Sequence, residues 1–250
     1  PATVIVGQTQ LFTATGYDVY NNILIGFSPI WTSDVGTVDG SGLFTAQTIN
    51  GSGIVEATSG AVSGSAAVTI LPGTIALITI MPESLTIGVG GTQQFFALAY
   101  DAYGNPIPGA TFDWTISIGT LDFFNLFTAP TTPGVGMVTA SNGAILDASL
   151  ITIVPGPIDH IAITPDPLSI TVGSVQQFTA QAYDQYNNPI SSLVYTWSST
   201  IGAIDSSGLF SALTVSGAGT VSATNGTFTG LATVNVQPDV LDHIFVTPTP

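Results

Sequence analysis

Asp and Asn side chains recur in one short motif, where their oxygen atoms have the chemistry to bind a hard cation. The motif reads YDVYNN at residues 17–22, YDAYGN at 100–105 and YDQYNN at 183–188. Ca²⁺ takes six or more oxygen ligands from carboxylates, amides and carbonyls. Asp and Asn also stabilise turns by accepting hydrogen bonds from the backbone that follows them. We favour this turn role and keep a Ca²⁺ site as the alternative.

Catalytic chemistry finds little support among the ionisable residues. His160 and His243 are the only histidines, and they occupy the same position in successive repeats, which favours a structural role. A glycosidase would need two convergent carboxylates, and the candidates are Asp113, Asp122 and Asp147. Asp122 recurs before a turn in each repeat, and nothing in the sequence brings the other two together. We therefore predict that the chain is not an enzyme.

The charge of the chain excludes several classes of partner. There is no Lys or Arg against 15 Asp and Glu, which gives a formal net charge of −15. Nucleic-acid binding by counterion release needs basic side chains, as does attraction to anionic lipid. With 45% hydrophobic residues the chain should fold, but no apolar run is long enough to predict membrane insertion. Because there is no Cys, neither disulfides nor Cys-ligated metals can stabilise the fold.

The elements that must position these residues follow a repeat of 83 residues. Trp31, Trp114 and Trp197 show it, since 114 − 31 and 197 − 114 both give 83. The repeat predicts domains at residues 1–73, 74–156 and 157–239. The first domain lacks its opening strand, and residues 240–250 carry the equivalent of that strand. There LDHIFVTPTP matches IDHIAITPDP at residues 158–167. We expect a mature chain or a segment of something longer.

Each repeat has the pattern of a β-sandwich of about seven strands. In the second repeat we expect strands at residues 75–80, 84–89, 92–100, 110–117, 126–129, 136–141 and 148–154. No segment has helical periodicity. One turn carries Gly42, Asn125 and Gly208 at equivalent positions, and Gly and Asn both tolerate a left-handed backbone, so we expect a positive φ there. The predicted fold class is all-β, with three tandem sandwiches.

The order of motifs resembles a known family. Residues 172–236 read VGxxQxFTAxAYDxYxNPI, then Trp197, IDSSGLFSA, VSAT and GxAxVxV. This order is similar to bacterial immunoglobulin-like (Ig-like) domains of group 2, and all three repeats share it. The resemblance implies tandem domains in extracellular stalks, fibres, cell-wall layers and adhesins at the cell surface. No lysine is present, whereas such domains usually carry some.

In an Ig-like array the YDxYxN turn would face the preceding domain. Asp184 and Asn188 would then approach Asp159, and these three residues form the predicted Ca²⁺ site. Asp101 and Asn105 would approach the linker at residues 73–76. The sequence predicts no cofactor other than this ion. Asn50 and Asn225 begin N-x-[ST] sequons, which would carry glycans in some secreted proteins, although Asn-Gly turns explain both residues equally well.

The second repeat carries apolar residues where the other two repeats are polar. These are Phe96, Leu98, Phe123 and Phe124. Strand alternation from Phe95 inward would place Phe96 and Leu98 outward. Exposed apolar clusters often mark contacts, so one interpretation is a contact with another chain. The alternative is that a loop covers them.

The unpaired strand of residues 240–250 has two explanations. It completes the first domain of another copy by donor-strand complementation, or it completes the next domain of one longer polypeptide. In both cases Leu241, His243, Ile244 and Val246 would form the contact. The partner is therefore the chain itself, and the predicted function is a structural part of an extracellular filament, sheath or surface fibre. The alternative is the stalk of an adhesin or receptor whose binding head lies elsewhere.

Overall fold

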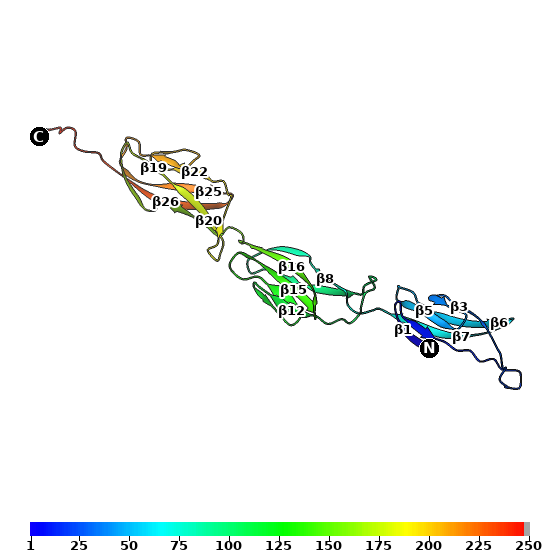
Figure 1. Cartoon of the computed structure of the whole chain (residues 1–250). Helices are drawn as coiled ribbons and strands as arrows, with labels where there is room; N and C mark the ends of the chain where they lie inside the picture. The colour runs from blue at the N-terminus through cyan, green and yellow to red at the C-terminus, as the bar shows by residue number, and fades with distance from the viewer. Residues whose placement is uncertain (248–250) are drawn as a thin grey trace.

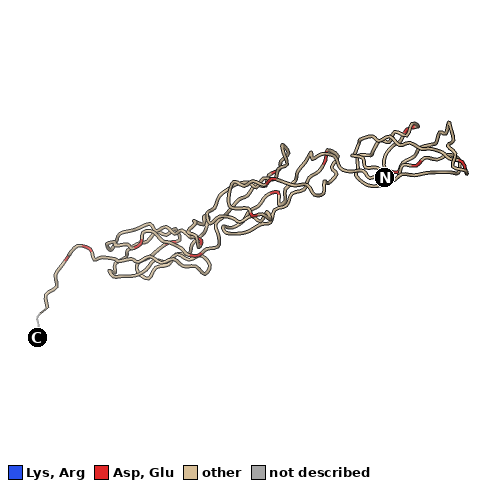
Figure 2. The backbone as a smooth tube through the Cα atoms, turned by 90° about the horizontal axis from the view of Figure 1, so that it is seen from below, with Lys and Arg blue, Asp and Glu red and all other residues tan. Residues whose placement is uncertain are grey.

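Three β-sandwiches lie in a row in the computed structural model, which describes residues 1–247 (Figure 1). The described residues contain no helix, and so no helix there could cross a membrane. The all-β fold class predicted from the sequence is confirmed. Acidic residues are scattered along the whole row, as Figure 2 shows.

The first sandwich is built from seven strands. They are β1 (Ala2–Ile5), β2 (Thr9–Leu11), β3 (Ile30–Ser33), β4 (Gly36–Val38), β5 (Leu43–Ala46), β6 (Gly51–Ser59) and β7 (Val62–Leu71). One sheet has the order β1-β7-β6-β3 and the other β2-β5-β4. In the first of these, β1 runs parallel to β7.

The second sandwich repeats this plan and adds a pair of strands. Its elements are β8 (Leu77–Met81), β9 (Ser84–Gly88), β10 (Thr92–Gln94), β11 (Phe96–Tyr100), β12 (Asp113–Ile116), β13 (Thr120–Leu121), β14 (Leu126–Thr128), β15 (Gly134–Asn142) and β16 (Ile145–Val154). The sheets are β12-β15-β16-β9, β10-β14-β13 and β11-β8. All seven strands expected in this repeat are present. The segment 92–100 divides at Phe95, and β13 is additional.

The third sandwich has the same arrangement. Its elements are β17 (His160–Thr164), β18 (Leu168–Thr171), β19 (Val175–Gln177), β20 (Thr179–Tyr183), β21 (Pro189–Ile190), β22 (Thr196–Ser199), β23 (Ala203–Ile204), β24 (Leu209–Ser211), β25 (Gly217–Asn225) and β26 (Phe228–Gln237). The sheets are β18-β26-β25-β22, β19-β24-β23 and β17-β20-β21.

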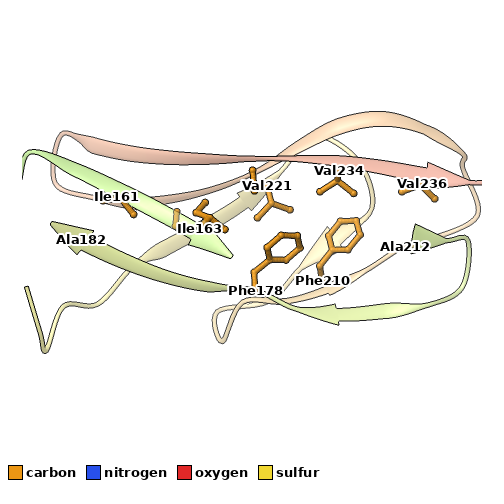
Figure 3. Packing of buried hydrophobic residues seen from close by; sticks show 11 residues of the cluster. Ile161, Ile163, Phe178, Ala182, Phe210, Ala212, Val221, Val234 and Val236 are labelled. Atoms are coloured by element: carbon orange, nitrogen blue, oxygen red, sulfur yellow. The ribbon is translucent and has the colours of Figure 1, made fainter. Parts of the chain in front are cut away.

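Each sandwich has its own core, centred on two phenylalanines. In the third, Phe178 and Phe210 meet edge to face at 6.0 Å, between valines of β25 and β26 and isoleucines of β17 (Figure 3). Phe95 and Phe127 make the same contact in the second sandwich. Such pairs contribute about 1 kcal/mol beyond their buried area. The turn beside them has the predicted positive φ at Gly42, Asn125 and Gly208.

The first sandwich lacks its opening strand, as predicted. Residues 13–16 correspond to β11 and β20, yet they form no strand. The cause is the missing partner strand, because β11 forms its ladder with β8. Among the described residues its counterpart in the first sandwich keeps the bridge between Tyr17 and Ile23 on one edge and has no strand on the other. The core of the first sandwich also lacks two buried isoleucines. The other two cores contain such a pair from the opening strand: Ile78 and Ile80 of β8, and Ile161 and Ile163 of β17.

Candidate functional site

The missing strand leaves a groove in the first sandwich. The groove has a volume of about 670 Å³ and runs between residues 12–17 on one side and residues 62–66 on the other. Trp31, Val55 and Ala57 form its apolar floor, and Leu24 and Phe27 contribute to its lining. An apolar groove between two extended segments has the shape that accepts a β-strand.

The other two sandwiches show what fills this position. In the second, β8 pairs with β11, Ile78 lies opposite Ala99, and the Ile80 N–H donates to Asp147 Oδ2 at 2.8 Å. In the third, a Cβ added to Gly230 would come within 2.5 Å of the Ile161 carbonyl oxygen, because β17 passes directly over this glycine.

Equivalent positions of the first sandwich are open. Gly64, the counterpart of Gly230, has no atom within 4 Å of where its Cβ would lie. Tyr17 is the counterpart of Tyr183, which stacks on His160 at 5.3 Å, and Tyr17 is 57% exposed. Phe27 partly fills the gap by packing against Gly16. The groove is therefore the position of an absent β8-like strand.

The tail after the third sandwich is an extended apolar segment. Residues 241–247 form no strand, and residues 248–250 of the predicted donor segment lie outside the described residues. Leu241, Ile244, Phe245 and Val246 are each more than three-quarters exposed. By the repeat, Ile244 and Val246 correspond to the buried Ile161 and Ile163. His243 corresponds to His160 and here contacts only Asp242, at 3.3 Å.

The YDxYxN turns lie at the junctions between sandwiches. At the first junction, the linker N–H of Gly73 donates to Asp101 Oδ2 at 2.8 Å. The side-chain amide of Asn105 donates to the Thr48 carbonyl at 2.8 Å, and its oxygen accepts from the Asn50 N–H at 3.0 Å. Asp101 thus reaches the linker at residues 73–76, as the sequence predicted.

The second junction repeats the first almost atom for atom. Gly156 N–H donates to Asp184 Oδ2 at 2.8 Å, and Asn188 donates to the Thr131 carbonyl at 2.7 Å. Both Asp184 and Asn188 are buried. The linker residue that contacts the Asp184 carboxylate is Gly156. The Asp159 N–H donates to the carbonyl of Tyr183, next to Asp184, at 2.8 Å, and the exposed Asp159 carboxylate lies 3.0 Å from His160 Nδ1. The predicted approach of Asp184 to Asp159 stays a prediction.

Hydrogen bonds within each turn explain its charge state. Asp184 Oδ1 accepts from the N–H groups of Tyr186 and Asn188 and from the Asn188 amide. Burial raises the pKa of Asp101 and Asp184, but the N–H donors of linker, amide and turn outweigh it and lower both pKa values to about 2. Both carboxylate oxygens are thus engaged by N–H donors, which supports the turn role.

The Ca²⁺ site at Asp159, Asp184 and Asn188 remains a prediction. Within residues 1–247 no cluster of three or more His, Cys, Asp or Glu has the geometry to hold a metal ion. The three residues do lie around one junction, but the carboxylates of Asp159 and Asp184 have different partners.

A tyrosine completes each junction in a way that the sequence interpretation missed. Tyr103 Oη lies 3.1 Å from where a Cβ on Gly7 would be, and Tyr186 Oη is 3.3 Å from the same point on Gly90. Gly7 and Gly90 both have a positive φ, near 71°. The signal was visible in the repeat, because Tyr and Gly recur every 83 residues at these positions.

The remaining predicted site residues are placed separately. Phe123 and Phe124 are exposed and meet edge to face at 5.5 Å, and Phe96 and Leu98 are exposed on β11. Their role in a contact stays a prediction.

Both sequon asparagines are half-buried, with Asn50 at the first junction. The Asn225 amide donates to the Val194 carbonyl. Glycosylation at these positions stays a prediction. The glycosidase candidates have backbone partners: Asp122 accepts from the N–H of Phe124 and Leu126, and Asp147 from that of Ile80.

Comparisons with known proteins agree with the sandwich fold. No family model matches the chain. Ice-binding protein 1 of Shewanella frigidimarina is 31% identical over 207 residues, which cover 79% of this chain and 23% of that protein. The chain therefore spans less than a quarter of this relative.

Two solved structures share the tandem architecture. The Escherichia coli adhesin FdeC is 17% identical, with a TM-score of 0.54 and 95% of both chains covered. The extracellular domain of protocadherin gamma B4 is 11% identical, with a TM-score of 0.52, covering 94% of this chain and 48% of that one. These likenesses show that the three units are Ig-like or cadherin-like β-sandwiches.

Proposed function

We propose that this chain is a structural segment of an extracellular array at the cell surface, in which residues 240–250 supply the opening strand of the following Ig-like domain. The domains at residues 1–73, 74–156 and 157–239 act as rigid spacers of the group 2 Ig-like kind. The observation that carries the proposal is the groove of the first sandwich, which occupies the position of β8 and β17 in the other two.

The register of the donated strand follows from the third sandwich. Ile161 lies opposite Ala182, and Ile163 opposite Ala180. The repeat therefore places Ile244 opposite Gly16 and Val246 opposite Ala14. Both side chains would face the groove floor, and Phe245 would point outward like the exposed Ala162. Burying one aliphatic side chain of this size contributes about 2 kcal/mol.

The test is binding of a synthetic peptide of residues 240–250 to a chain that ends at residue 239. Residues 240–247, the described part of this segment, make no strand pairing, so removal of the segment should leave the three sandwiches intact. We expect binding by calorimetry and new amide protection at residues 13–17. Ile244→Asp in the peptide should abolish binding, whereas the outward Phe245→Ser should retain it. No binding, or equal loss with both variants, would refute strand donation.

Two arrangements satisfy this proposal, and one measurement separates them. The strand belongs either to a separate copy or to the next repeat of one polypeptide. An intact mass of the native chain near the calculated 25.5 kDa, after glycan removal, would indicate separate copies. A much larger mass would indicate a continuous array.

A second candidate function is the stalk of an adhesin or other surface binding protein. The exposed aromatic residues Phe96, Phe123 and Phe124 favour it, because they offer a contact surface on the middle sandwich. The relative's name refers to ice, so thermal hysteresis of the chain is the direct control. A spacer should show no thermal hysteresis. If the chain shows hysteresis and the double change Phe123→Ser with Phe124→Ser removes it, the result would support a binding role.

A further inference from the structure

We propose that the first and third sandwiches form a further junction between two copies of the chain, in which the turn of residues 18–22 docks onto the far end of the third sandwich of the preceding copy. The inference rests on the proposed function, because strand donation brings these two sandwiches together. It adds a contact surface outside the groove, with its own residues.

The docking turn of the first sandwich is already formed. Asp18 Oδ1 accepts from the N–H groups of Tyr20 and Asn22, and Asp18 Oδ2 accepts from the Asn22 amide, all at 2.8 Å. Asn21 has a φ of 64°, matching Asn187 at 61°. Only the bonds to a preceding sandwich are absent. The turn therefore needs no rearrangement to bind, which keeps the entropic cost of association low.

Exposure sets this turn apart from its two counterparts. Asn105 and Asn188 are 5% and 6% exposed, whereas Asn22 is exposed; Tyr20 is 82% exposed against 41% for Tyr186. The loop between β2 and β3 that carries this turn projects from the end of the row away from the second sandwich (Figure 1).

The third sandwich presents the matching socket. Gly173 has a φ of 81°, like Gly7 and Gly90, and the space around its Cβ position is open. Its N–H donates to the Ala212 carbonyl at 2.6 Å and to the Leu213 carbonyl at 3.3 Å, and Leu213 is the counterpart of Pro130, whose carbonyl accepts from the N–H of Gly90. Thr214 is the counterpart of Thr48 and Thr131, so its carbonyl would accept the hydrogen bond from the Asn22 side-chain amide. The Tyr20 ring would pack against Gly173, as Tyr103 packs against Gly7.

One residue makes the new junction differ from the internal ones. The linker glycines 73 and 156 are replaced by Asp239. A Cβ added to Gly156 would lie 3.5 Å from the Asp184 Cβ, which is ordinary contact, so Asp239 fits sterically. Its carboxylate, however, would lie near Asp18. Like charges at this distance repel, and salt weakens the repulsion. The junction between copies should therefore be weaker than the internal ones, and salt-dependent.

The experiment is sedimentation equilibrium of the full chain and its variants. We expect Asn22→Ala and Tyr20→Ala each to weaken self-association by about tenfold. Asp239→Gly, which restores the internal sequence, should tighten it and reduce its salt dependence. Asp113→Asn is the matched control, because it removes the same charge from an exposed residue of the middle sandwich, outside the junction.

Binding of the 240–250 peptide to the truncated chain, measured in parallel, separates the two proposals. Asn22 and Tyr20 do not line the groove, so their variants should bind the peptide normally. If association requires the tail but ignores both variants, the junction is refuted and strand donation stands. If peptide binding and association are both absent, strand donation fails and the junction with it. A chain that binds peptide yet stays monomeric refutes the second copy as partner.

Site-specific crosslinking provides an independent test, because the chain has no Cys. Chains with Asn22→Cys should crosslink through a short thiol reagent to chains with Thr214→Cys. Asn188→Cys with Thr131→Cys in one chain is the positive control for reach. Thr227→Cys is the negative control. Thr227 immediately precedes β26, at the end of the third sandwich opposite to Thr214.

Discussion

At the residue scale, Ser149 can be compared directly with the equivalent residues of the other two sandwiches. Its hydroxyl is fully buried on β16 and has no hydrogen-bond partner within the described residues. The equivalent positions carry Ala66 and Ala232. A buried polar group without a partner costs about 1–3 kcal/mol.

We therefore expect Ser149→Ala to raise the free energy of unfolding of the second sandwich by about 1 kcal/mol. Urea denaturation would measure it. The reverse change, Ala232→Ser, should destabilise the third sandwich by a similar amount. A loss of stability in Ser149→Ala would show that the hydroxyl has a partner after all.

The junction carboxylates predict a defined dependence of stability on pH. The pKa of Asp184 is lowered from 3.8 to about 2 in the folded chain. A lowered pKa means that the charged form stabilises the fold above about pH 4, and that this contribution is lost as pH falls toward 2. The melting temperature should fall across this window, as calorimetry would show.

Asp184→Asn isolates the contribution of this group. The difference in melting temperature between the original chain and Asp184→Asn should be largest at neutral pH and should shrink between pH 4 and pH 2. A difference that stays constant down to pH 2 would contradict the assignment. The Asn22 side chain lowers the pKa of Asp18 in the folded chain, so Asp18 should contribute to stability with the same direction of pH dependence.

Residue types alone predicted part of these features. The positive φ at Gly42, Asn125 and Gly208 followed from two residue types that tolerate it well. The lack of a hydrogen-bond partner for the Ser149 hydroxyl could not be predicted from residue types, because it depends on which atoms of β8 face β16 across the core. The bond from the Gly156 N–H to Asp184 was not predictable either, since a backbone N–H leaves no mark in a sequence.

At the scale of elements, the opening strand is the unit on which each sandwich depends. Ile163→Ala in β17 removes a buried side chain, 6% exposed, from the core of the third sandwich. We expect a loss of about 3 kcal/mol in the free energy of unfolding. Fluorescence of Trp197, in chains where the other two Trp are replaced by Phe, would follow it. The exposed Ala162→Ser should change little, and a loss below about 1 kcal/mol in Ile163→Ala would contradict the role of β17.

The sequence pattern predicted which segments form strands better than it predicted which strands pair. The alternation at residues 92–100 correctly placed Phe95 inward and Phe96 outward. It did not show that the segment would change sheets at Phe95, with β10 pairing to β14 and β11 to β8. Residues 13–16 have the same kind of alternation without forming a strand, because a ladder needs a partner that sequence periodicity does not supply.

At the scale of the whole molecule, charge repulsion is uncompensated. With −15 net charge and no Lys or Arg, screening by salt should stabilise the fold. We expect the melting temperature to rise between 10 mM and 500 mM NaCl. A melting temperature that ignores salt would contradict this.

The same titration tests the predicted cation site. At equal ionic strength we expect CaCl₂ and NaCl to have equal effects, because the oxygens of Asp101 and Asp184 already accept N–H donors. A larger rise with CaCl₂, removed by Asp184→Asn, would support the Ca²⁺ site at Asp159, Asp184 and Asn188.

The parallel pairing of β9 with β16 determines how the array responds to pulling. A chain under tension is pulled at the start of each sandwich in one direction and at its end in the other. Because β9 and β16 run parallel, from Ser84 and Leu150 to Gly88 and Val154, these forces slide the two strands lengthwise. All hydrogen bonds of the ladder are then loaded together in shear, instead of opening one after another. β1 with β7 and β18 with β26 share this geometry, so each sandwich should resist forced unfolding and carry load along the row.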